Sequence, residues 1–231
     1  MYRSLNPGHI VTTISRLRDR IQERFPESSL NKVAGELQQI ADESVARGEW
    51  IARPLLPLRI GIGLLVALIA AVPLLALANL HLTMRLQGIG EFVQAIESGV
   101  NDLVFVGIAI FFLVTIEIRL KRRRALKAIH ELRSLAHIID MHQLTKDPDV
   151  IVNPGPATKS SPARSMSSFE LSRYLDYCSE MLSLVGKVAA LYVQQLDDPV
   201  VLAAVDEIED LTAGISRKVW QKIMIINQDR G

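Results

Sequence analysis

Residues 130–142 gather side chains that could bind a metal ion or transfer a proton. Their sequence, HELRSLAHIIDMH, contains three of the chain's five histidines together with Glu131 and Asp140. Imidazole nitrogens and carboxylate oxygens are common zinc ligands, and imidazole also titrates near neutral pH. The question is whether these groups converge on one point.

The spacing of the histidines argues against convergence. His130 and His137 are seven residues apart, which in a helix places the two rings on one side but about 10 Å apart along the axis, too far to share an ion. His137 and Asp140, at positions i and i+3, could share a metal, but two ligands do not make a site. The alternative of a metal-dependent enzyme that uses His137 and Asp140 therefore ranks below a pH-responsive contact or interface through His130 and His137.

A helix with two different faces explains the segment better. At 100° per residue the apolar residues fall on one side and the two histidines on nearly the opposite side. Cys178, on the apolar face of a later helix, is expected to be a small core residue. The sequence predicts no catalytic residue, no metal site and no cofactor, so the protein is not expected to be an enzyme. The predicted core face consists of Ala125, Ala128, Leu132, Leu135 and Ile139.

The helices that must position these residues include two apolar segments. Residues 60–80, IGIGLLVALIAAVPLLALANL, contain no charge over 21 residues. Such a helix is about 31 Å long, enough to cross a hydrocarbon layer of about 30 Å. Gly63, Ala67 and Ala71 recur at steps of four and are predicted to allow close helix packing. We expect a first transmembrane helix within residues 53–81.

The second apolar segment, residues 101–120, carries more polar groups. It contains Thr115 and, near its end, Glu117, whose carboxylate can pair with Lys121 at i+4. Asn79 is a further polar residue close to the end of the first segment. Polar groups inside a membrane often mark ion paths. Glu117, Asn79 and Thr115 are therefore candidate pore residues.

The basic residues are distributed unevenly around these segments. The loop between them, residues 81–102, has Arg85 as its single basic residue against three acidic ones. Because positive charge favours the cytoplasmic side, both termini are predicted to be cytoplasmic, at a bacterial inner membrane. Trp50 is placed to anchor at the interface, and the basic run is expected to bind anionic lipid rather than nucleic acid. The predicted membrane-surface residues after the second segment are Arg119, Lys121, Arg122, Arg123, Arg124 and Lys127.

The remaining sequence predicts helices with clear end signals. Asn6 should cap a helix that starts at Pro7, and Pro26 should stop it. Ser167 with Glu170 forms a capping-box signature, and Asp198 should cap a last helix. The predicted regions are an N-terminal cytoplasmic helical hairpin (1–52), a first transmembrane helix (53–81), a short external loop with an amphipathic helix (82–100), a second transmembrane helix (101–120), a basic cytoplasmic helical extension (121–146), a linker rich in proline and serine (147–168) and a C-terminal antiparallel helical hairpin (169–231).

These elements together predict an all-α protein: a two-span transmembrane hairpin whose N- and C-terminal helical hairpins form a bundle or coiled-coil-like module. The net charge of +1 gives no overall field that would recruit nucleic acid. We expect a non-enzymatic membrane anchor for an interaction or oligomerisation module, with the lipid bilayer and a second copy or a helical protein as partners. An oligomeric channel or pore-forming effector is the alternative.

Overall fold

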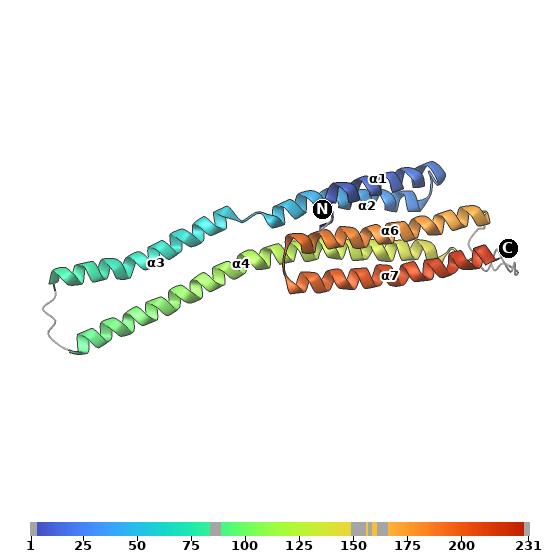
Figure 1. The fold of residues 1–231 in the computed structure, drawn as a ribbon. Coiled ribbons are helices and arrows are strands. Elements are labelled where there is room, and N and C mark those ends of the chain that lie inside the picture. Colours follow the sequence, from blue (N-terminus) through green and yellow to red (C-terminus); the bar gives the residue numbers. More distant parts are fainter. Residues whose placement is uncertain (1–3, 84–88, 149–155, 157–158, 161–165, 229–231) are drawn as a thin grey trace. The chain divides into compact units, whose positions relative to one another are not determined.

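The computed structural model describes residues 4–83, 89–148, 156, 159–160 and 166–228. Over these residues every regular element is a helix, so the predicted all-α class is confirmed (Figure 1). Most of the predicted linker at 147–168 and residues 84–88 of the predicted external loop lie outside the described residues. The helices are α1 (Pro7–Arg24), α2 (Ser29–Ala52), α3 (Leu56–Thr83), α4 (Ile89–Leu144), α6 (Ser168–Gln195) and α7 (Pro199–Gln228).

Helix ends follow the local capping chemistry. The side chain of Asn6 accepts a hydrogen bond from the His9 amide at 3.2 Å, and α1 begins at Pro7 as predicted. At the start of α6 the Ser167 hydroxyl accepts from the Glu170 amide at 3.2 Å, and the Glu170 carboxylate accepts from the Ser167 amide at 2.8 Å. Both orphan amides are thus satisfied, which confirms the predicted capping box.

The two apolar segments lie in α3 and α4, which are long and apolar enough to cross a membrane. α3 runs for 28 residues through Pro73, and α4 for 56 residues. The sequence of α4 contains no proline, so nothing interrupts its hydrogen-bond ladder. The helix continues past residue 120 to Leu144, as predicted, and it also runs without a break through residue 100, where the sequence analysis separated the external loop from the second span.

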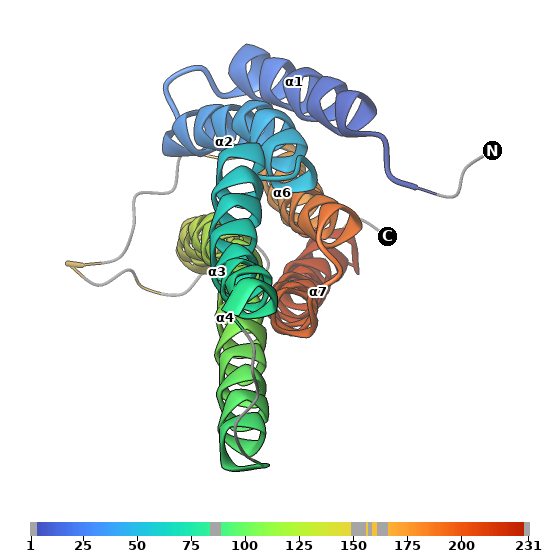
Figure 2. The ribbon, with the colours of Figure 1, turned by 90° about the vertical axis from the view of Figure 1, so that its left-hand side faces the viewer.

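The chain divides into two compact units: the core unit, residues 1–52 and 122–231, and the apolar unit, residues 53–121. In the core unit α6 packs along α7 and also contacts α1 and α2, and Figure 2 shows it between α2 and α7. Met181 and Leu182 of α6 are fully buried, and Cys178 is buried as predicted. Because α6 has neighbours on several sides, its buried residues extend beyond the single apolar face that the sequence predicts.

The last part of α4 belongs to the core unit. All five residues of the predicted core face, from Ala125 to Ile139, are buried. His130 and His137 are exposed, as expected for the opposite side of the helix. Ion pairs and hydrogen bonds join this part of α4 to α2 and α7. The two-faced helix is therefore confirmed.

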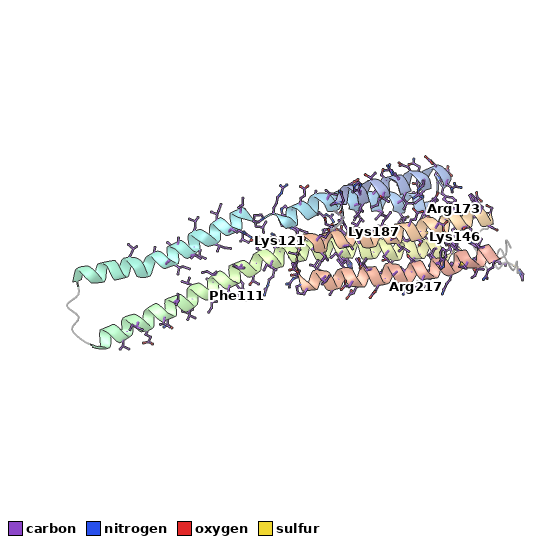
Figure 3. All side chains as sticks on the ribbon, in the orientation of Figure 1. Phe111, Lys121, Lys146, Arg173, Lys187 and Arg217 are labelled. Carbon is purple, nitrogen blue, oxygen red and sulfur yellow. The ribbon has the colours of Figure 1, made fainter. Side chains whose placement is uncertain are left out.

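The apolar unit exposes the side chains that dominate its composition. On α3, Leu64 is 68% exposed and Leu68 65%, and on α4, Phe105 is 71% and Phe111 75%. Figure 3 labels Phe111 on this part of α4, where side chains project from the ribbon. Contact between water and such large apolar side chains is unfavourable. No part of the chain described here covers them.

Candidate functional site

Two groups of charged side chains border the apolar helices in the sequence. One lies within the apolar unit and is formed by Arg59, Glu117 and Lys121; we call it the carboxylate cluster. The other lies within the core unit, around Trp50 and Arg124, and lines a groove that we call the Trp50 groove. Both groups contain residues that the sequence analysis selected.

Glu117 is the centre of the carboxylate cluster. Its side chain is 11% exposed, and one carboxylate oxygen accepts from Nε of Arg59 at 3.0 Å. The other oxygen accepts from a second Arg59 nitrogen at 3.3 Å and lies 3.1 Å from Nζ of Lys121. The Leu55 amide adds a longer contact of 3.5 Å. The carboxylate thus joins the first turn of α3 to α4.

The pairing of Glu117 with Lys121 is the i,i+4 contact expected from the sequence. The partner that sequence reasoning missed is Arg59, which is 58 residues away in the chain. Opposite charges at the ends of two apolar segments were the available signal. The ion pairs of the cluster join two helices and leave Glu117 engaged with two cations, which does not favour a role in proton transfer.

The other candidate pore residues show no such convergence. The Thr115 hydroxyl donates to the carbonyl oxygen of Phe111 at 2.7 Å, within its own helix. The side chain of Asn79 lies outside the described part of the structure. At Gly63 an added Cβ would meet no atom within 4 Å, and Gly63 and Ala67 are exposed. Among the described residues, none contacts the position of a Cβ at Gly63, so the packing role of the Gly63, Ala67 and Ala71 stripe stays a prediction.

The Trp50 groove has a volume of about 490 Å³. Trp50 is half-buried, and the guanidinium of Arg124 lies 3.6 Å from the centre of its ring. This is the geometry of a cation–π contact, and it holds the two side chains together across α2 and α4. The groove is lined by Ala46, Arg47, Trp50, Ile51, Arg124, Lys127 and Ala128.

Arg47 has a different role from the other two cations of the groove. Its guanidinium pairs with Glu131 at 2.7 Å and with Glu43 at 2.5 Å. The hydrogen bond to Glu131 raises the pKa of Arg47, against the opposing effect of burial. Arg47 is therefore committed to joining α2 and α4, whereas Arg124 and Lys127 have no acidic partner among the residues that the structure describes.

The rest of the basic run is divided by its contacts. The Arg122 guanidinium donates to the buried carboxylate of Asp198 at 2.8 Å, which also accepts from the amides of Val200 and Val201. Burial raises the pKa of Asp198, but the Arg122 hydrogen bond and the two amides outweigh it, and the net pKa is lowered. Arg122 thus supports the capped start of α7, while Arg119 and Arg123 are exposed.

The histidine-rich segment gathers no metal-binding cluster. Within the described part of the chain, no three His, Cys, Asp or Glu side chains are placed to hold one ion. The Asp140 carboxylate accepts from the Gln143 amide group at 2.6 Å. His142 contacts the Ser29 hydroxyl at 3.4 Å, and burial, assisted by Lys146, lowers its pKa.

Comparisons of the chain with protein-family models, with curated proteins and with solved structures find no match.

Proposed function

We propose that the protein is a non-enzymatic integral membrane protein in which α3 and α4 form a two-span hairpin that anchors the core unit. The observation that carries the proposal is the exposure of large apolar side chains along both helices, up to 75% at Phe111. A bilayer provides the apolar surroundings that such surfaces need. At 28 residues, α3 has a length of about 42 Å, sufficient to span the hydrocarbon and reach the headgroups.

The charge distribution supports one orientation. Basic residues flank the two apolar segments at Arg53, Arg59 and the run from Arg119 to Lys127, whereas the connection between the spans is poor in them. By the positive-inside rule both termini then lie in the cytoplasm, at a bacterial inner membrane. In this orientation the carboxylate cluster lies at the cytoplasmic end of the spans, where charged side chains cost less than at the bilayer centre.

The core unit serves as an interaction module in this proposal. Its surface exposes large apolar side chains on α4 and α7, among them Met141 at 66% and Trp220 at 60%. Association with a second copy or with a helical protein would cover these side chains. A particle that is monomeric in detergent, without a co-purifying partner, would oppose this part of the proposal.

The alternative of an oligomeric channel has no comparable support. Its central candidate, Glu117, is paired with Arg59 and Lys121. Ion flux through liposomes containing the purified protein separates the two functions. The anchor requires no flux, and flux that Glu117→Ala abolishes would favour the channel.

Alkaline carbonate extraction of cell membranes tests the anchor. We expect the wild-type protein to remain in the pellet and Leu68→Arg to be partly released, because an arginine at mid-span costs about 2.5–3.5 kcal/mol. The matched control is Leu202→Arg, at a residue of α7 that is 47% exposed in the core unit, which should stay in the pellet. Release of the wild-type protein by carbonate would overturn the proposal.

A further inference from the structure

We propose that the Trp50 groove binds the phosphate headgroup of one anionic phospholipid. The inference rests on the proposed membrane location and names the residues that recognise lipid there. It assigns the contact to Arg124 and Lys127 rather than to the basic run as a whole.

The lining of the groove fits an amphiphile. Its apolar part consists of Trp50 with Ala46, Ile51 and Ala128, and its cationic part includes Arg124 and Lys127. A volume of about 490 Å³ is within the range of small-molecule sites. A molecule with a compact negative charge beside an apolar part matches both halves of this lining.

Arg124 is arranged to bind phosphate. Stacking on Trp50, at 3.6 Å from the ring centre, occupies one face of the guanidinium. The N–H donors lie in the guanidinium plane and remain available for bidentate binding of phosphate oxygens. Lys127, one turn further along α4, adds a second charge and is exposed. The groove therefore offers two cations that form no ion pair with a described acidic side chain, beside Arg47, whose charge is paired with Glu43 and Glu131.

The position of the groove in the sequence identifies the source of the phosphate. Its residues lie at 46–51 and 124–128, immediately before and after the apolar unit at 53–121. If the apolar helices cross a bilayer, both chain segments leave it at the headgroup layer. Phospholipid is the anionic amphiphile at that layer, and each cation near an anionic membrane surface increases binding about fivefold.

Quenching of Trp50 fluorescence tests the inference with the full chain. The sequence has two tryptophans, so Trp220→Phe leaves Trp50 as the sole reporter. The protein is incorporated into phosphatidylcholine vesicles that contain a nitroxide-labelled phospholipid, either phosphatidylglycerol or phosphatidylcholine, with the label at the top of the acyl chain. We expect the apparent affinity of the quenching lipid to be at least about fivefold higher for phosphatidylglycerol.

Two matched double variants locate the effect. Arg124→Gln combined with Lys127→Gln should remove the preference for phosphatidylglycerol. The preference is measured as the ratio of the apparent affinities of the two quenching lipids. Loss of the Arg124 contact changes Trp50 fluorescence equally with either lipid, so it does not affect this ratio. Arg119→Gln with Arg123→Gln removes the same charge from outside the groove and should keep most of the preference.

Each other outcome overturns the inference. Equal quenching by both lipids in protein that is properly incorporated would refute it and leave the membrane anchor intact. Equal loss of preference in both double variants would show diffuse attraction, and displacement by glycerol phosphate at constant ionic strength would show a site for a soluble anion. Failure to incorporate into vesicles would refute the membrane anchor as well.

Discussion

At the scale of single residues, the ion pair between Glu117 and Arg59 links α3 to α4. We predict that Glu117→Gln and Arg59→Gln are not additive and give a coupling energy of about 1 kcal/mol. The value should lie near that of surface pairs because Arg59 is 59% exposed, although Glu117 is only 11% exposed. Denaturant unfolding in detergent micelles measures it through a double-mutant cycle.

The control for this cycle is Arg119→Gln combined with Glu117→Gln. Arg119 is an exposed cation of the same helix, and its effect should add to that of Glu117→Gln within about 0.5 kcal/mol. Equal coupling in both cycles would mean that Glu117 senses general positive charge rather than Arg59.

Asp198 gives a pH-dependent prediction. Its folded pKa lies below the unfolded value of about 3.9, so its contribution to stability is present above that pH and is lost as pH falls through the folded value. Asp198→Ala, which also removes a helix cap, should lower the free energy of unfolding by about 1–2 kcal/mol at neutral pH. Thermal melts at pH 7 and in acid should show the difference between wild type and variant shrinking in acid, and a constant difference would contradict the assignment.

Cys178 reports on the folding of the core unit. Burial raises the pKa of its thiol to about 12, against a smaller opposing effect of Lys222 and Lys146. Because the thiolate is the reactive form, a maleimide should label Cys178 very slowly in native protein and rapidly in denaturant. The comparison is Ser134→Cys in a Cys178→Ala background, at an exposed site. Native Cys178 that reacts as fast as this exposed thiol would contradict the buried position.

At the scale of elements, the capping box at the start of α6 provides the next prediction. Ser167→Ala leaves the Glu170 amide without its acceptor, and we expect the free energy of unfolding to fall by about 1 kcal/mol. Ser168→Ala, one position inside the helix, should have a smaller effect, since alanine is favoured there. Chemical denaturation monitored by circular dichroism distinguishes the two. Equal losses would exclude a specific contribution of the cap.

The ends of helices could be predicted from the sequence because the responsible residues are local. Asn6, Ser167 and Asp198 each satisfy amides two or three residues away, so a short segment contains the whole signal. The burial of α6 on several sides could not be predicted in this way. It depends on α1, α2 and α7 packing around it, and those neighbours are distant in sequence.

In the candidate site, too, contacts between residues close in sequence were predictable and contacts between distant residues were not. The pairing of Glu117 with Lys121 was predictable because both residues share a helix face. The pairing of Arg122 with Asp198 was not predictable, because 76 residues separate the two and the basic run offers several arginines that could pair with a given carboxylate. The sequence identified the basic run as a group, and the structure separates Arg122, which supports α7, from Arg124, which lines the Trp50 groove.

At the scale of the whole molecule, the two units bury apolar surface differently. The core unit buries its apolar side chains within the chain, whereas the apolar unit exposes them. The stability of the first should therefore depend on its internal packing, and that of the second on its surroundings. This difference separates folding of the core unit from membrane retention.

A cavity in the core unit tests that separation. Leu182 of α6 is fully buried, so Leu182→Ala should lower the free energy of unfolding of the core unit by about 2–5 kcal/mol, seen as a lower melting temperature. Carbonate-resistant membrane retention should stay unchanged, because α3 and the first half of α4 contain none of this packing. Leu202→Ala, at an exposed position of α7, should change the free energy of unfolding by no more than about 0.5 kcal/mol. It should also leave membrane retention unchanged. Release of Leu182→Ala by carbonate would mean that membrane retention depends on the folded core unit.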